Sequence, residues 1–377
     1  MKKSATLFGY HGKQNIGDDI FLTTICHWLA TRDVCHCYVK GASEHIPTEC
    51  QGVSIDTFEN PIKQVSRLQW LRVFQYALKS DYFIFAAGSI FTIQPFFIVY
   101  LTLLLLRVMR GRRLKIYAIG VSIGPFRNLS DQRWCRKAFA LMNHILLRDD
   151  RSAELMSRYF KLNNWELAHD LALPYLLKNS ITTREQTDPS NIIIGLSITK
   201  RGYGGCKGNH TDACDAITAI LSNKLSDNHN ISVRLYSVCS DLQDGDLELC
   251  KHLKCRLKQY SDRIEIHEYD TNSINRTIVS IHDCDAMVSY RMHAGVIALF
   301  SAVPLLQLSY SEKIRGFFDN NHLDKSYLYD DHAITTDVLE HFLSAAISGD
   351  LSSLALLQRQ RVMSNAIKMK EHLFSIS

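Results

Sequence analysis

The chain has 377 residues, of which 46% are hydrophobic and 21% are charged, and its formal net charge is +5. This composition excludes a disordered protein, and the length exceeds that at which one hydrophobic core usually stops growing, so we expect two domains. The small positive charge, without dense Lys and Arg clusters, argues against a nucleic-acid partner but fits an anionic substrate or membrane surface.

Cysteine usage and the first residues predict a cytoplasmic protein. The eleven cysteines are an odd number with irregular spacing, and the start MKKSATLFGYHG lacks the apolar stretch and cleavage site of a secretory signal. The groups Cys35–Cys37 and Cys250–Cys255 each include a histidine, but neither has the paired spacing of a zinc site. We therefore expect reduced thiols, no metal and no organic cofactor.

In the first half of the chain, short apolar runs alternate with helical patterns. The predicted strands are Ala5–Phe8, Val34–Val39, Tyr82–Ala86, Leu114–Ile119 and Ile145–Leu147. The predicted helices between them are Asp19–Ala30, Pro61–Leu78, Phe96–Met109 and Gln132–Asn143. This alternation predicts a doubly wound α/β domain over residues 1–177.

One segment of that domain is apolar enough to need a membrane check. Between Pro95 and Arg107 it offers about 12 residues, short of the roughly 20 that span a bilayer. Phe96–Leu106 is apolar nearly all round, so we predict a helix that is covered on both sides. A basic cluster follows and leaves open the alternative that this edge rests on the inner face of an anionic membrane: Arg107, Arg110, Arg112, Arg113 and Lys115.

A polar, turn-rich stretch at 178–191 is predicted to be a linker. Beyond it the predicted strands are Ile192–Ile198, Ser232–Val238, Arg263–His267, Ala286–Ser289 and Pro304–Leu308. The predicted helices are Thr211–Leu225, Asp246–Leu257, Ile274–His282, Ala294–Ala302 and Glu312–Asn320. We therefore expect a second α/β domain over 192–348, a C-terminal helix in 349–377, and two Rossmann-like domains facing a cleft at the carboxyl ends of both sheets.

The first turn of the chain, LFGYHGKQNIGDD, is rich in glycine and acids. Glycines 9, 12 and 17 permit positive φ and open the backbone to a ligand, but no Walker loop or GxGxxG follows. Asp19 is equally well explained as a residue that caps the helix dipole. For Asn15 and Asp18 we expect hydrogen bonds to a hydroxylated substrate, with one of them as a base.

A second polar group, SYRMHAG, lies between an apolar strand and an apolar helix. Arg291 can grip a carboxylate or phosphate, and His293 can move a proton near neutral pH. The alternative is a surface arginine beside a capping histidine. The position at the end of a strand favours the interpretation that Arg291 and His293 belong to a functional site.

Other strand ends supply further candidates. Lys200 and Arg201, in a glycine-rich loop, suit an anion contact or a lid, or are simply solvated charges. AIGVSIGP, LLRDDRS and AHDLAL each end an apolar strand and deliver groups to a common edge. Within LLRDDRS, Arg148 and Asp149 are equally compatible with a structural ion pair.

Taken in order, these motifs resemble one family, the polysaccharide pyruvyl transferases. The resemblance runs from about Phe8 to Phe318, and the set is more specific than any one motif. It is carried by GKQNIGDD, FAAGSIF, IGVSIGPF, LRDDRS, HDLAL, SYRMHAGVIALFSAVP and SYSEKIRGF.

The resemblance implies a GT-B-like fold and transfer of pyruvate from phosphoenolpyruvate to sugar hydroxyls of a polysaccharide or its precursor. It places the donor on the second domain, at Arg291, Met292 and His293, and the acceptor on the first. The acceptor residues would be Gly12, Asn15, Gly17, Asp18, Gly88 and Ser89.

There are two departures from the family pattern. Ala87, Gly88 and Ser89 stand where three glycines are common. Thr199 stands where an arginine is frequent, which leaves Lys200 or Arg201 as a substitute.

The residue types fit this chemistry independently. A cyclic ketal forms from an enol phosphate by protonation of the methylene carbon, attack of two hydroxyls and loss of phosphate, which requires cations, an acid and a base. His293 would be the acid and Asp18 the base or the group that orients the hydroxyl. The cations would be Arg291 with Lys200, Arg201 or Lys313.

Three rival interpretations remain. A GT-B glycosyltransferase using a nucleotide-sugar shares the fold, and a non-catalytic polysaccharide assembly protein could have kept it. A dinucleotide oxidoreductase is disfavoured because GxGxxG is absent. The acceptor is expected to be a glycan or a lipid-linked sugar.

Overall fold

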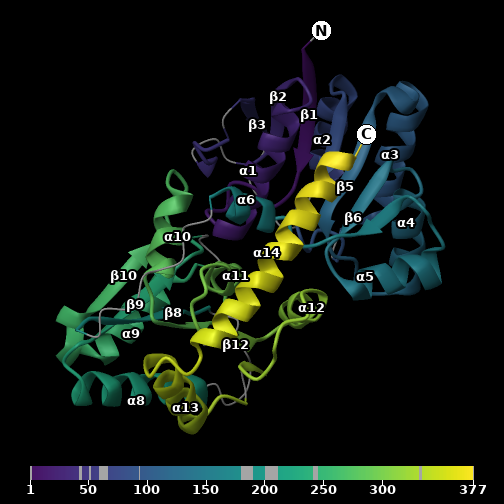
Figure 1. Ribbon diagram of the computed structural model, residues 1–377. Coiled ribbons are helices and arrows are strands. Elements are labelled where there is room, and N and C mark those ends of the chain that lie inside the picture. Colours follow the sequence, from purple (N-terminus) through teal and green to yellow (C-terminus); the bar gives the residue numbers. More distant parts are fainter. Residues whose placement is uncertain are drawn as a thin grey trace. The chain divides into compact units, whose positions relative to one another are not determined.

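The computed structural model describes residues 2–41, 45–50, 52–58, 67–92, 94–179, 190–199, 211–240, 245–330 and 333–376. The chain divides into two compact units (Figure 1). Unit 1 comprises Met1–Lys13, Gly17–Tyr175 and Asn365–Ser377, and unit 2 comprises Gln14–Ile16 and Leu176–Ser364.

Unit 1 is built on a parallel sheet of seven strands in the order β3-β2-β1-β4-β5-β6-β7. Apolar, largely β-branched and aromatic residues fill its central strands, as expected when helices cover both faces. The strands are β1 (Lys3–Phe8), β2 (Val34–Lys40), β3 (Ser54–Phe58), β4 (Tyr82–Phe85), β5 (Lys115–Val121), β6 (His144–Leu147) and β7 (Trp165–Leu167). The sequence did not lead us to predict the two edge strands, β3 and β7.

Helices connect these strands in the manner of a doubly wound fold. They are α1 (Ile16–Ala30), α2 (Arg67–Lys79), α3 (Phe96–Arg110) with the 3-10 turn η2 (Gly111–Arg113), α4 (Leu129–Phe139), α5 (Asp150–Glu154) with the π turn η3 (Leu155–Phe160), and α6 (Leu173–Lys178). Helices α2, α3 and α4 share one hydrophobic core with the central strands. They therefore form one layer, with α3 packed between α2 and α4.

Unit 2 repeats the plan with six parallel strands in the order β10-β9-β8-β11-β12-β13. The strands are β8 (Ile192–Ser197), β9 (Ile231–Ser237), β10 (Ile264–Glu268), β11 (Ala286–Ser289), β12 (Leu305–Ser309) and β13 (Leu328–Asp330). The helices are α8 (Thr211–Asp227), α9 (Leu247–Arg256) with η4 (Lys258–Arg263), α10 (Ile274–His282), α11 (Met292–Phe300), α12 (Glu312–Asn320), α13 (Thr336–Ile347) and the first part of α14 (Ser352–Ser375). From Asn365 on, α14 belongs to unit 1. β13 and α13 were not predicted from the sequence.

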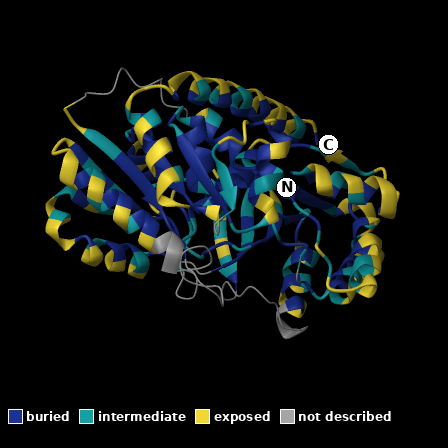
Figure 2. Cartoon of the chain, turned by 90° about the horizontal axis from the view of Figure 1, so that it is seen from below, coloured by how far each residue is buried: buried dark blue, intermediate teal, exposed yellow. Residues whose placement is uncertain are grey.

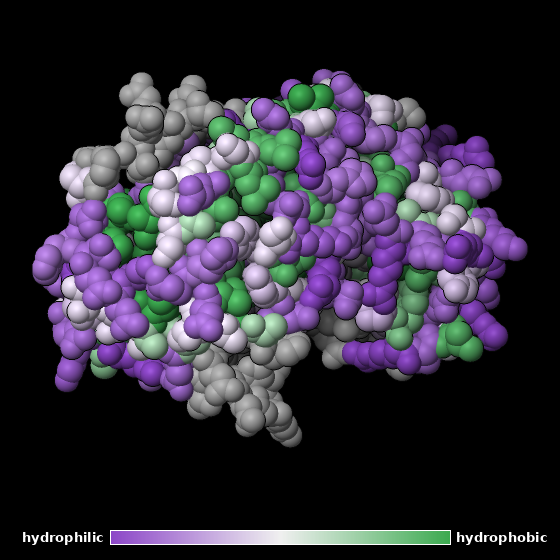
Figure 3. Space-filling view, turned by 60° about the horizontal axis from the view of Figure 1, so that its bottom comes forward, coloured by the Kyte–Doolittle hydropathy of each residue, from purple (hydrophilic) through white to green (hydrophobic). Residues whose placement is uncertain are grey.

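Burial follows the layers of each unit. The strands are mostly buried, and the helices carry exposed residues on their outer faces (Figure 2). Apolar side chains also reach the surface, where they gather in patches between hydrophilic ones on the face seen in Figure 3. Such patches are informative where they are contiguous.

The apolar helix α3 is one source of surface apolar residues. We predicted a helix covered on both sides, and that prediction is wrong for one face. Phe96, Val99, Leu103 and Leu106 are buried. By contrast, the opposite side exposes Phe97, Leu101, Leu105, Val108 and Met109. Within the described residues, no helix is both long and apolar enough to cross a membrane.

Candidate functional site

Arg291 lies at the carboxyl end of β11 and directly precedes helix α11. Its guanidinium is held by the carboxylate of Asp246, which precedes α9. The Nε atom of Arg291 donates to both carboxylate oxygens at 3.1 and 3.0 Å, and Nη2 donates to Oδ1 at 2.5 Å. This bidentate geometry fixes the plane and the direction of the guanidinium.

The Arg291–Asp246 pair is removed from water. The side chain of Asp246 is fully buried and that of Arg291 is 13% exposed. Burial raises the pKa of Asp246 to about 6, although Arg291 and the backbone N–H groups of Cys239 and Val238 oppose the shift. For Arg291, burial disfavours the charge, but Asp246 outweighs it and raises the pKa. Both partners are therefore charged at neutral pH.

A second cation lies at the end of the neighbouring strand. β12 pairs in parallel with β11, so the residues that follow the two strands share one edge. Tyr310 directly follows β12. The Nζ atom of Lys313, an exposed residue in the first turn of α12, lies 5.9 Å from the centre of the Tyr310 ring. The two cations therefore follow neighbouring strands of the sheet.

Two helices begin at this same edge. Among the described residues, neither α11 nor α12 has a side-chain cap on its first turn. Arg291, at the start of α11, has no acceptor atom in its side chain, and the Oγ of Ser311, at the start of α12, accepts no backbone N–H there. The N–H groups and the positive dipole ends of both helices favour an anion, as do the nearby cations.

The other donor residues predicted from the sequence are in the same segment or outside the described part. His293 lies in the first turn of α11 and is half-buried, with its Nε2 atom shielded from solvent. The side chain of Met292 is buried, so its backbone is the part that can face a ligand. Lys200 and Arg201 lie outside the described residues.

Gly9, in the glycine-rich first turn, does not have the role that the sequence predicted for it. A Cβ atom at Gly9 would lie 2.4 Å from Nε2 of His11 and 2.7 Å from the carbonyl oxygen of Ala86. Gly9 therefore makes room for the ring of His11 and for the neighbouring strand, not for a ligand. Gly12, with φ of +73°, does adopt a backbone conformation that glycine favours.

His11 was overlooked in the sequence. It is fully buried, and burial, with a smaller contribution from Lys40, lowers its pKa to about 4. It is therefore neutral at pH 7. Next to it, burial and the carboxylate of Asp18 raise the pKa of Tyr10 to about 12. Asp18 is half-buried at the start of α1, and Gly17 is buried beside it.

Asn15 belongs to unit 2, although the sequence predicted it in the first domain with Asp18. It forms an antiparallel bridge with Cys239, and Ser240 N–H donates to Gln14 O at 2.9 Å. Cys239 O in turn accepts from the N–H of Asp246 at 2.9 Å. Asn15 is thus linked through Cys239 to the aspartate that holds Arg291.

In unit 1, residues of the three motifs that were predicted to share an edge lie together around Arg148, and Ser89 of FAAGSIF joins them. Its Nε donates to Ser122 Oγ at 2.7 Å, Nη1 to Asp170 Oδ2 at 3.2 Å, and Nη2 to Ser89 Oγ at 3.4 Å. A Cβ at Gly88 would lie 2.1 Å from Nη1, so the guanidinium packs against that glycine. The structure therefore gives Gly88 and Ser89 a contact within the protein.

The alternative pairing of Arg148 with Asp149 is wrong. Arg148 pairs with Asp170, whose side chain is 1% exposed. The carboxylate of Asp149 instead caps α5 by accepting from the N–H of Ser152 at 2.8 Å. Neighbouring residues at a strand end point in different directions, which the sequence does not reveal.

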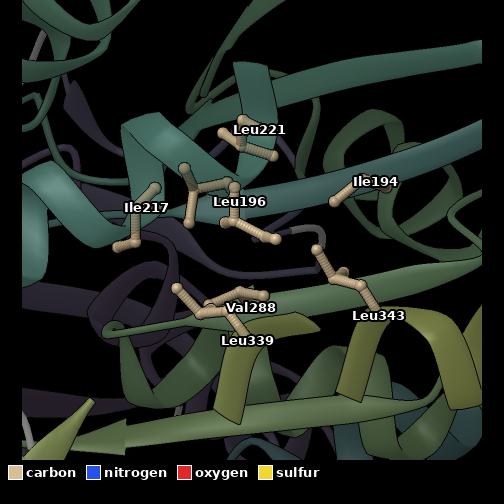
Figure 4. Close-up of a pocket in the computed structure, with 8 residues that line it drawn as sticks. Ile194, Leu196, Ile217, Leu221, Val288, Leu339 and Leu343 are labelled. Atoms are coloured by element: carbon tan, nitrogen blue, oxygen red, sulfur yellow. The ribbon is translucent and has the colours of Figure 1, made fainter. Parts of the chain in front are cut away.

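Two further features do not add a site. A cavity of about 10 Å³ in unit 2 is lined entirely by apolar side chains (Figure 4), so we regard it as a packing void. Its lining residues are Ile194, Leu196, Ile217, Ile220, Leu221, Val288, Leu339 and Leu343. In the part of the chain that the structure describes, no three His, Cys, Asp or Glu side chains are grouped to hold a metal ion.

Comparison with known proteins identifies relatives of the chain. A family model described as polysaccharide pyruvyl transferase matches residues 15–312. No curated protein matches the chain.

Solved structures are similar in fold at low identity. HepE of Anabaena in complex with UDP-glucose is 11% identical, with a TM-score of 0.57 over 98% of this chain and 99% of that chain. UDP-GlcNAc 2-epimerase from Neisseria meningitidis is 11% identical, with a TM-score of 0.61 over 98% and 99%. A putative UDP-N-acetylglucosamine 2-epimerase from Listeria monocytogenes is 7% identical, with a TM-score of 0.61 over 99% and 95%. These similarities support a two-domain, Rossmann-like GT-B fold.

Proposed function

The chain belongs to the polysaccharide pyruvyl transferase family, and on that premise we propose that it transfers pyruvate from phosphoenolpyruvate to two hydroxyls of a sugar. The product would be a cyclic ketal on a polysaccharide or on its glycan or lipid-linked precursor. The reaction breaks the bond between the enol oxygen and the donor carbon as well as the C=C π bond, and it forms two C–O bonds at that carbon. Of the two protons lost by the sugar hydroxyls, one is replaced on the methylene carbon, which becomes a methyl group, and the other leaves with the released phosphate.

The observation that carries the proposal is the positive edge of unit 2. Phosphoenolpyruvate has a carboxylate and a phosphate, so its site needs several cations or N–H donors placed in advance. Arg291 follows β11, and Lys313 follows the neighbouring strand β12, in the first turn of α12. The first turns of α11 and α12 add N–H groups at the same edge. We propose that the donor anion binds there.

Asp246 would keep Arg291 ready for the donor. A guanidinium on a flexible stem loses conformational entropy when it binds, but one already fixed by a carboxylate loses less. The bidentate contact from Asp246 provides this fixation while the pair remains buried. We therefore regard Asp246 as a positioning residue for Arg291.

We propose His293 as the acid that protonates the methylene carbon. It is two residues from Arg291, in the first turn of the same helix. Histidine is the side chain that most often serves as a general acid or base, because an imidazole can both give and regain a proton in each cycle. Met292 would contribute its backbone, because its side chain is buried.

For the acceptor we propose Gly12, Asn15, Gly17 and Asp18, with Asp18 as base or as the group that orients the attacking hydroxyl. Asn15 and Asp18 carry oxygen atoms that can accept from sugar hydroxyls. We now assign Gly88 and Ser89 to the support of Arg148. The guanidinium packs against Gly88 and donates a hydrogen bond to Ser89 Oγ.

Ligand-dependent melting of the purified full chain tests the proposal. A ligand that binds only the native state raises the melting temperature, by the equivalent of about 2.7 kcal/mol at a concentration of 100 Kd. We expect phosphoenolpyruvate to do so, and UDP-glucose and NAD not to. Stabilisation by UDP-glucose alone would favour a nucleotide-sugar glycosyltransferase, and stabilisation by neither would favour a non-catalytic assembly protein.

The roles of His293 and Asp18 are tested by turnover. Phosphate release from phosphoenolpyruvate is followed with a panel of glycans, alongside calorimetric titration of the donor. His293→Gln should lower turnover ~10²- to 10⁴-fold, the usual contribution of a general acid, and leave donor affinity within a few-fold. Asp18→Asn should weaken use of the acceptor and leave donor affinity unchanged. Near wild-type turnover in His293→Gln would remove His293 from proton transfer.

A further inference from the structure

Helix α3 of unit 1 carries a continuous apolar stripe on its solvent side. Its exposed residues recur at the spacing of one helix face, and all of them are apolar. Val108 is 76% exposed and Met109 is 59% exposed, well above what an incidental gap in packing leaves. From the start of the helix to its end, this α3 stripe consists of Phe97, Leu101, Leu105, Val108 and Met109.

The α3 stripe is bordered by positive charge. α2 and α3 contain no Asp or Glu, and α4 contains one, Asp131. On α2 and α4, which pack against α3 on either side, several basic residues are exposed: Arg72, Lys79, Arg133, Arg136 and Lys137. The layer thus presents an apolar centre with a basic border.

The basic cluster at the end of α3 divides into two groups. Arg107 donates to the carbonyl oxygens of Leu141, Gly111 and Leu114, and Arg110 donates to those of Leu78 and Ser80. These two arginines therefore hold the end of the helix in place. Arg112 and Arg113 are exposed beyond them, where the α3 stripe ends.

The like charges of Arg107 and Arg112 at this end of the helix repel each other. Burial and the like charge of Arg112 both lower the pKa of Arg107. Positive potential is thus concentrated at one end of the apolar stripe, and an anionic surface would relieve the repulsion.

We propose that the α3 stripe docks on the surface of a bilayer that contains anionic lipids, with Arg112 and Arg113 at the level of the headgroups. An apolar helix face with a basic border is the pattern of helices that lie in the membrane interface. The helix has 15 residues, fewer than the roughly 20 needed to cross a bilayer, so it lies along the surface. The proposal is independent of the proposed function, because none of these residues belongs to the donor or acceptor site.

Vesicle co-sedimentation with the purified full chain tests this docking. The probes are phosphatidylcholine vesicles with and without phosphatidylglycerol. We expect binding to the anionic vesicles that weakens as salt is raised to about 0.5 M, because salt screens exposed charges. Leu101→Glu combined with Leu105→Glu should lower the partition coefficient at least ~10-fold, and Arg112→Ala combined with Arg113→Ala should lower it several-fold.

A matched control comes from α14. Leu356 and Leu357 are 45% and 44% exposed, close to the 40% and 44% of Leu101 and Leu105, but they lie outside the α3 layer. Leu356→Glu combined with Leu357→Glu should bind vesicles as the wild type does. Circular dichroism melting confirms that each variant is folded, and Leu101→Ala with Leu105→Ala replaces the glutamate pair if that pair does not fold.

Three results would overturn the proposal. The first is no binding of the wild type to anionic vesicles. The second is equal loss of binding in the α3 variants and the α14 control. The third is a wild-type dimer that ignores vesicles and that the α3 variants convert to a monomer in sedimentation equilibrium, which would make the stripe an interface between two copies of the chain.

Discussion

Arg148 of unit 1 and Arg291 of unit 2 each follow a strand of a parallel sheet, and each is paired with a buried aspartate. Their surroundings differ. Arg148 also contacts two serine hydroxyls, and a glycine lies against the face of its guanidinium. Arg291 is at the start of a helix, and Lys313 follows the neighbouring strand.

The two helix starts show the same contrast. In unit 1 the first turn of α5 is capped by the carboxylate of Asp149, so the protein supplies its own anion. In unit 2, among the described residues, α11 begins at a cation and has no side-chain cap. An arginine whose other donors are taken by neutral partners, next to a capped helix, serves the fold. An arginine at the start of an uncapped helix, with a second cation after the neighbouring strand, suits an external anion.

The largest effect is expected from Arg148→Ala, and it should be on stability. Removing the guanidinium leaves the buried carboxylate of Asp170 without its charged partner, which costs roughly 3 to 5 kcal/mol of folding free energy. Urea unfolding measures the loss. Arg151→Ala, an exposed residue of the adjacent helix α5, is the control and should change stability by less than about 0.5 kcal/mol. A stable Arg148→Ala protein with impaired donor binding would reverse the contrast with Arg291.

Arg291→Ala should weaken donor binding, in addition to the stability that is lost because buried Asp246 is left without its partner. The loss of a charged group that binds an anion in a mostly buried setting costs about 2 to 5 kcal/mol of binding free energy. Calorimetric titration with phosphoenolpyruvate gives the value. Arg315→Ala is the control for Arg291→Ala, because Arg315 also pairs with an aspartate of unit 2 but its side chain is 39% exposed. Unchanged affinity in folded Arg291→Ala would exclude this residue from the site.

Asp246→Asn should have the smallest effect, roughly 1 to 3 kcal/mol on donor affinity, because a neutral amide holds Arg291 less firmly. The pH dependence sharpens the test. The folded-state pKa of Asp246 is raised to about 6 from 3.8, so protonation below about pH 6 should weaken its hold on Arg291.

The same shift predicts a change in stability with pH. Between about pH 4 and pH 6 the folded state binds the extra proton, so the stability contributed by Asp246 falls as pH rises through this range. In Asp246→Asn both pH dependences should disappear. If wild type and variant show the same profile for donor affinity and for stability, Asp246 does not position Arg291.

The sequence predicted the main elements of both sheets well, because their strands are apolar runs and their helices are periodic. It did not predict β3, β7 and β13, which lie at sheet edges, where burial is partial and the apolar signal is weak. The exposed stripe of α3 was also missed, since periodicity does not show which face of a wholly apolar helix is covered.

Within the candidate site, Arg291 and His293 could be chosen from the sequence, and Asp246 could not. Asp246 lies in the stretch SDLQDGDLEL, where several acids follow one another, and only the fold selects the one that reaches Arg291. His11 was overlooked for a related reason. Gly9 lies against its ring and Gly41, which follows β2, lies against its carbonyl oxygen, so its burial involves a contact between segments apart in the sequence.

Unit 1 is completed by the last residues of the described chain. The final turns of α14 belong to it, and Ala366, Met369 and Leu373 are buried there. The Nδ1 atom of His372 lies 2.8 Å from Glu166 Oε2, and Arg32 Nη2 donates to the carbonyl oxygen of Phe374 at 3.3 Å. During translation, therefore, the N-terminal half lacks the part of its packing that α14 supplies until the chain beyond unit 2 has been made. A fragment that ends at Tyr175 would expose the apolar surface of unit 1 against which α14 packs. The two units should therefore be separated by circular permutation and not by truncation.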